Sequence, residues 1–64
     1  MQLKAWRVAK GKTQKWLSEA TGIDQALLSK YENGTTPLPR NARKIERATN
    51  GEVSLEDWYP QGEE

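Results

Sequence analysis

The chain has 64 residues, the length of one small domain, and hydrophobic residues make up only 34% of it. Such a chain buries only about 60% of the surface that it exposes when unfolded, so its core has to be compact. It has no Cys, which excludes disulfides and zinc-finger sites, and no His, the usual metal ligand and general base. We therefore expect no enzymatic activity, no bound metal, no cofactor and no small-molecule substrate.

The net charge of +1 hides an uneven distribution along the chain. Residues 1–47 contain ten Lys and Arg and four acids, a balance of +6, whereas residues 48–64 contain five acids and no basic residue. This polarity would let one face approach a polyanion while the other points away. Without a further motif, a solvated surface with an acidic tail is the simpler explanation.

Nothing in the sequence indicates a membrane or a secretory route. No apolar run approaches the roughly 20 residues that a membrane-spanning helix needs. Met1 is not followed by the apolar region of a signal peptide. We expect a cytoplasmic protein with no membrane partner.

A first helix is expected over residues 2–10, with Leu3 and Trp6 as its apolar residues and Val8 as a further candidate. Arg7 lies beside this apolar set, so we expect it to be at least partly buried. A buried Arg needs a partner.

Two short helices joined by a tight turn follow. Thr13 is a good N-cap for a helix over 14–21, and Gly22 can end that helix in the left-handed conformation. Asp24 can then cap a helix over 25–32. This arrangement is typical of a helix-turn-helix.

The helix over 25–32 has two different faces. At about 100° per residue, Leu28 and Tyr31 fall together and face inward. The opposite face consists of Ala26, Ser29, Lys30 and Asn33, with Gln25 and Leu27 on its flanks. Short side chains and amide or amine groups suit a helix that contacts base edges in the major groove. Taken alone, this face fits a solvated surface and a DNA-reading surface equally well.

The remainder predicts a connector at 35–39, a helix over about 40–49 and a short helix at 55–58. The outer side of the first of these helices is basic, with Arg40, Arg43, Lys44 and Arg47. We expect an all-α domain of five helices over residues 1–60 and a loose acidic tail at 61–64.

The first half of the chain resembles the Cro/C-repressor (XRE-type) helix-turn-helix family in the pattern Thr13-Gln14…Leu17…Gly22-Ile23…Leu28-Ser29…Tyr31-Glu32…Gly34. The second half is similar to the YdaS-like/phage Cro branch in the pattern Pro39…Ile45-Glu46…Ala48-Thr49…Gly51…Val53…Pro60. Together the two patterns span nearly the whole chain. The resemblance implies a compact five-helix, lambda-repressor-like DNA-binding domain with the helix-turn-helix at its second and third helices.

The resemblance also implies how the domain meets DNA: the third helix enters the major groove, and the second lies across the backbone. Base contacts are implied for Gln25, Ala26, Leu27, Ser29 and Lys30. Phosphate contacts are implied for Gln14, Lys12, Lys15, Asn33, Thr35 and Arg40, the last near the backbone or the minor groove. Gln25 suits adenine, because an amide can bond that base twice, and Gln14 is expected to brace it.

In this family an Arg in the first helix pairs with a Glu at the end of the third, here Arg7 and Glu32. We expect a mostly buried ion pair whose role is geometric more than stabilising, since desolvation cancels much of the attraction. Truncating one partner should still cost about 3–5 kcal/mol, because the other charge stays buried alone.

Four residues depart from the family pattern. Ser18 replaces the usual Ala, which is tolerable if its hydroxyl bonds back along the helix. Asp24 replaces a Ser or Thr cap and brings a negative charge near the phosphates. Lys12 occupies a commonly apolar position, which suggests that it has turned outward toward phosphate. Trp16 occupies a usually polar position, where we favour packing over Trp6 and keep a partner-binding spot as the alternative.

Family members bind as dimers on half-sites about one helical turn apart, roughly 34 Å. Leu55, Trp58 and Tyr59 are the candidates for a dimer interface, because the last helix has more aromatic surface than its anchoring needs. That Trp58 simply closes the core is at least as good an explanation for that residue. We expect a weak or DNA-induced homodimer.

The function that follows is binding to a double-stranded DNA operator as a Cro-like transcriptional repressor, as in a bacteriophage. One alternative is an antitoxin-type regulator that binds a toxin partner as well as its own promoter. Another is a protein-interaction module that has lost DNA binding, against which the basic balance of residues 1–47 argues.

Overall fold

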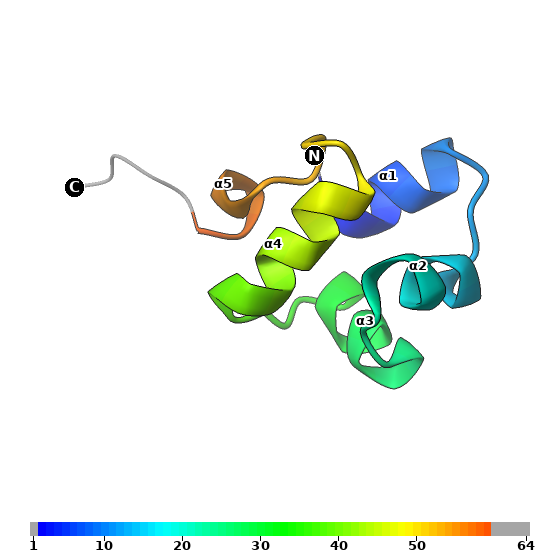
Figure 1. Cartoon of the computed structure of the whole chain (residues 1–64), viewed down its shortest axis with the longest axis horizontal. Coiled ribbons are helices and arrows are strands. Elements are labelled where there is room, and N and C mark those ends of the chain that lie inside the picture. The colour runs from blue at the N-terminus through cyan, green and yellow to red at the C-terminus, as the bar shows by residue number, and fades with distance from the viewer. Residues whose placement is uncertain (1, 60–64) are drawn as a thin grey trace.

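The structure, a computed structural model, describes residues 2–59. These residues contain five α-helices and no strand (Figure 1). They are α1 (Leu3–Ala9), α2 (Gln14–Thr21), α3 (Gln25–Glu32), α4 (Pro39–Ala48) and α5 (Leu55–Trp58). The predicted all-α class is confirmed. The expected end of the domain at Pro60 and the tail at 61–64 lie outside the described residues.

Local capping explains where the two helices of the helix-turn-helix begin and end. The Thr13 hydroxyl accepts the Trp16 N–H at 3.0 Å and starts α2. Gly22 ends it at φ 76°, a left-handed conformation that favours glycine. The Asp24 carboxylate accepts the Ala26 N–H at 3.1 Å and starts α3. The predicted bounds of both helices are confirmed.

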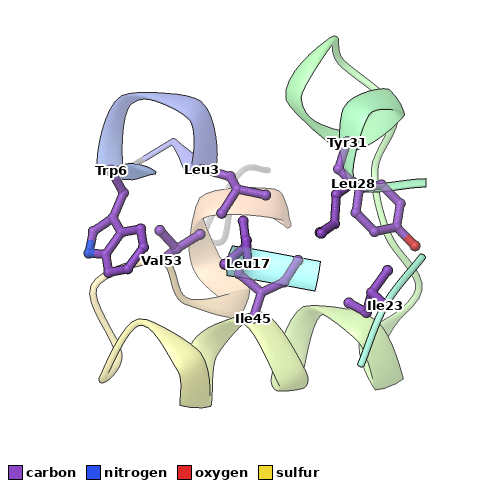
Figure 2. Packing of buried hydrophobic residues seen from close by; sticks show 8 residues of the cluster. All are labelled: Leu3, Trp6, Leu17, Ile23, Leu28, Tyr31, Ile45 and Val53. Carbon is purple, nitrogen blue, oxygen red and sulfur yellow. The ribbon is translucent and has the colours of Figure 1, made fainter. Parts of the chain in front are cut away.

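The core lies between the helices and consists of Leu3, Trp6, Leu17, Ile23, Leu28, Tyr31, Ile45 and Val53 (Figure 2). In this view α4 runs along one side of the core, and α1 and α3 lie on the other. α2 packs against both α3 and α4, and α5 packs against α4.

The expectation of Val8 as a further core residue was wrong, because its side chain is 61% exposed. At 100° per residue, Val8 falls on the opposite side of α1 from Leu3 and Trp6.

Two hydroxyl groups fix the turn between α2 and α3. The buried Thr21 hydroxyl donates to the Leu17 carbonyl at 2.8 Å and accepts the Ile23 N–H at 3.1 Å. The Ser18 hydroxyl donates to the Ile23 carbonyl at 2.6 Å, forward into the turn rather than back along α2 as expected. Both backbone groups of Ile23 are therefore bonded while its side chain fills the core.

The C-terminal half is tied to the rest at two places. The Trp6 indole N–H donates to Glu52 at 2.6 Å, and Lys10 lies 3.6 Å from the same carboxylate, which joins α1 to the α4–α5 loop. The Tyr59 hydroxyl donates to the carbonyl of Pro37, which fixes the end of α5 beside the α3–α4 connector.

We predict that Thr21→Val lowers the free energy of unfolding by about 1–3 kcal/mol, because it leaves the buried Ile23 N–H without an acceptor while keeping the side-chain volume. Urea denaturation followed by circular dichroism measures the loss. Thr36→Val, at an exposed position, is the matched control and should unfold at the parent midpoint. Equal midpoints for Thr21→Val and the parent would show that the hydroxyl does not hold the turn.

Candidate nucleic-acid interface

The outward face of α3 presents unengaged polar groups to solvent. Gln25 and Lys30 are exposed and Ser29 is half-buried. Within residues 2–59, none of these three side chains makes a hydrogen bond or an ion pair. Ala26 is exposed between them. The face therefore offers an amide, a hydroxyl, an ammonium and a methyl group without first having to break a contact inside the domain.

Leu27, placed on the flank of this face by the sequence, is half-buried and packs against the core. The part of its side chain that contacts the core is not accessible to a ligand. Only its exposed part is available for an apolar contact outside the domain.

A buried carboxylate at the end of α3 holds the helix in place. Arg7 bonds Glu32 twice, with Nε 2.7 Å from Oε2 and Nη2 3.1 Å from Oε1. The side chain of Glu32 is 3% exposed and that of Arg7 is 16% exposed. The predicted, mostly buried ion pair between α1 and α3 is confirmed.

The same network has two members that the sequence did not reveal. The side-chain amide of Gln14 donates to Oε1 of Glu32 at 3.0 Å. Within residues 2–59 the side chain of Gln14 therefore bonds Glu32, and the expectation that it braces Gln25 was wrong. Arg7 Nη1 donates to the carbonyl of Lys12 at 3.0 Å, so the loop between α1 and α2 is held as well.

The network also sets the charge of its members. Burial raises the pKa of the Glu32 carboxyl, but the hydrogen bonds from Arg7 and Gln14, with the charges of Arg7 and Lys4, outweigh it and leave the pKa below its ordinary value. The hydrogen bond to Glu32 raises the pKa of Arg7 further above its ordinary value. The pair is ionised at neutral pH.

The first turn of α2 has two backbone N–H groups without a partner in the described residues. Because Thr13 caps the Trp16 N–H, the backbone N–H groups of Gln14 and Lys15 have no acceptor within residues 2–59. Unpaired N–H groups in the first turn of a helix attract anions such as phosphate. Lys15 is exposed beside them and adds a positive charge.

Lys12 and Trp16 form a contact that the sequence did not predict. Lys12 is exposed, and its ammonium lies 4.6 Å from the centre of the Trp16 ring, a cation–π arrangement. The Trp16 ring in turn lies 6.3 Å from that of Trp6. The preferred interpretation of Trp16 as local packing over Trp6 is confirmed. Lys12 would have to leave the ring to reach a phosphate.

The other expected phosphate contacts differ in what they have free. The Asn33 amide donates to the Ser29 carbonyl at 2.9 Å, and the Thr35 N–H donates to the Lys30 carbonyl at 3.0 Å, so both close the end of α3. Asn33 retains one amide hydrogen and Thr35 its hydroxyl. Arg40 is exposed in the first turn of α4 and has no ion pair within residues 2–59.

The three residues expected at a dimer interface are half-buried. The Trp58 ring packs edge-on against Tyr31 at 6.2 Å, and Tyr59 bonds Pro37. Both therefore help to close the domain, as the alternative interpretation of Trp58 suggested. Leu55 begins α5 and is partly accessible.

Within residues 2–59, none of the helices has both the length and the apolar character needed to span a membrane. No group of three or more acidic side chains, the only metal-ligating type that this chain offers in number, comes together in the described residues.

We predict that Arg7→Ala lowers the free energy of unfolding by about 3–5 kcal/mol at pH 7, because Glu32 is then a buried charge with no cation bonded to it. Urea denaturation is the measurement. Val8→Ala, at the next and exposed position, is the control and should change the stability little. If Arg7→Ala unfolds like the parent, the pair does not hold α3.

The free energy of unfolding should depend on pH differently in the parent and in Arg7→Ala. Because folding lowers the pKa of Glu32, the stabilisation is complete above the ordinary carboxyl pKa of 4.5 and is lost as the pH falls through the folded value. In Arg7→Ala the main cation is gone and burial favours the protonated acid. The difference in stability between parent and variant should therefore narrow below pH 4.5, and a constant difference would contradict this origin.

Comparison with known proteins identifies the family. A model of the family described as helix-turn-helix matches residues 3–58, from the first turn of α1 to the end of α5. Neither the curated proteins nor the solved structures include a match to this chain. Since the family model covers most of the chain and includes the α2–turn–α3 unit, the chain belongs to the helix-turn-helix family of DNA-binding regulatory domains.

Proposed function

We propose that the chain binds a specific operator in double-stranded DNA and represses transcription there, as a phage Cro does, by excluding polymerase or another regulator. The observation that supports this most directly is the outward face of α3, whose polar side chains have no partner within residues 2–59 while the opposite face is locked into the core.

Each residue of this face has a role that its chemistry suits. Gln25, at the start of α3, bonds an adenine edge through both ends of its amide. Ala26 and the exposed part of Leu27 contact thymine methyl groups. Ser29 and Lys30 contact a base edge or the adjacent phosphate.

Phosphate contacts on both sides of α3 set the register of the domain on the duplex. The unpaired N–H groups of Gln14 and Lys15 support an anchor at the start of α2. The Thr35 hydroxyl and the Arg40 guanidinium supply the other side. Lys12 joins by leaving Trp16, and Asn33 by its remaining amide hydrogen.

A single domain contacts too few base pairs to select one operator, so we propose a homodimer on DNA with half-sites about one turn apart. Leu55, Trp58 and Tyr59 would form its interface. Their partial exposure supports this position, and their contacts within the domain support a dimer that is weak or forms only on DNA.

An antitoxin-type regulator would need an exposed patch for its toxin partner, and Trp16 and Trp58 are the aromatic candidates for it. Both rings are half-buried, and each packs against an aromatic neighbour in its own domain.

Selection of bound sites from random DNA tests the proposal. We expect a half-site with a strong preference for adenine at one position, and Gln25→Ala should relax that position alone, by about 1–3 kcal/mol. Lys15→Gln is the control, because it should weaken binding to all sequences alike and lower the salt slope by about one unit. Recovery of no preferred sequence, or binding that ignores salt, would contradict the proposal.

A further inference from the structure

A second basic surface lies on α4. Arg43, Lys44 and Arg47, which we call the outer α4 face, are all exposed. None of them forms an ion pair within residues 2–59. Arg47 lies four residues from Arg43 and three from Lys44, so like charges are neighbours on the helix and destabilise it. A helix that tolerates this repulsion gains most from a polyanion that neutralises it.

This face points away from α3. Ala42 and Ile45, on the inner side of α4, are fully buried. In Figure 2, α4 lies on one side of the core, and α3 lies on the other. The outer α4 face is therefore separated from the α3 face by the thickness of the domain, and one straight duplex in the groove of α3 does not account for it.

A hollow of about 390 Å³ adjoins this face between α2 and α4. It is lined by Ala20, Thr21, Lys44, Arg47 and Ala48. Three of the lining residues are small and the other two are cationic, a combination that favours an anion over a large apolar side chain.

We propose that Arg43, Lys44 and Arg47 bind the phosphate backbone of a second DNA duplex, so that one domain holds two segments of DNA. Arg43 and Arg47 are separated by about 6 Å along the axis of α4, and each DNA strand has a phosphate about every 3.4 Å along the axis of the duplex. The face therefore spans about two phosphates.

The choice of DNA among polyanions rests on the proposed function. A domain that is held on an operator by α3 has other segments of the same DNA nearby at high effective concentration. An acidic protein has the same sign of charge but no such reason to be close, so it is treated as the competing outcome of the test.

The test is a titration of the ¹⁵N-labelled chain with a 15-base-pair duplex of arbitrary sequence at low salt, followed by NMR. Amide signals of residues 43–47 and Ala20 should shift, as should those of α3. The triple variant Arg43→Gln/Lys44→Gln/Arg47→Gln should weaken the response at 43–47 at least tenfold and leave that of α3 within twofold. Lys12→Gln/Lys15→Gln/Lys30→Gln removes the same charge from the α2 and α3 side, without touching α4, and should do the reverse.

A second readout mixes donor-labelled and acceptor-labelled duplexes. The parent should bring the two labels together, and the outer-face triple variant should not. Energy transfer that survives in that variant would mean that two α3 faces of a dimer do the bridging, and the proposal would be wrong. It would also be wrong if residues 43–47 and α3 weaken together in both variants, or if polyglutamate shifts 43–47 and DNA does not. A response at 43–47 with none at α3 would support the α4 site and count against the proposed function.

Discussion

The arrangement of α3 depends on one group, the carboxylate of Glu32. It is almost completely buried and accepts hydrogen bonds from Arg7 and Gln14, so it links α1, the start of α2 and the end of α3. A buried charge tolerates few positions, because each lost bond leaves it unsolvated. The network therefore limits how α3 can rotate or slide against α1 and α2, while the polar side chains of its outward face have no partner within residues 2–59.

The turn supplies the second constraint. Thr21 and Ser18 bond both backbone groups of Ile23, and the Ile23 side chain enters the core. The beginning of α3 is thus set by this turn and its end by Glu32. Gln14 takes part in both constraints at the ends of α2 and α3, because its side chain bonds Glu32 while its backbone N–H, at the start of α2, has no acceptor within residues 2–59. One residue therefore couples the setting of α3 to the place where we propose a phosphate.

The sequence predicted best what local chemistry decides. Thr13, Gly22 and Asp24 are capping signals that act within three residues, and the helices begin and end where they indicated. The Arg7–Glu32 pair was predicted only through the family resemblance, since the two residues are 25 positions apart. The Gln14–Glu32 bond and the position of Lys12 over Trp16 depend on how the helices pack, which no local sequence pattern indicates. Val8 was misplaced on its apolar character alone, although helical spacing puts it on the opposite side of α1 from Leu3 and Trp6.

We infer that the Glu32 network sets the geometry of α3 for the proposed DNA binding and adds little stability beyond what an apolar pair would supply. The most direct measurement is the ratio of affinities for a selected site and a scrambled site in Arg7→Met/Glu32→Met, where apolar side chains replace the pair. Such replacements are often neutral or stabilising, so the variant should unfold at or above the parent denaturant midpoint. We predict that its ratio of affinities for the selected and the scrambled site nevertheless falls at least tenfold below that of the parent. A variant that is as stable as the parent and keeps the parent ratio would contradict it.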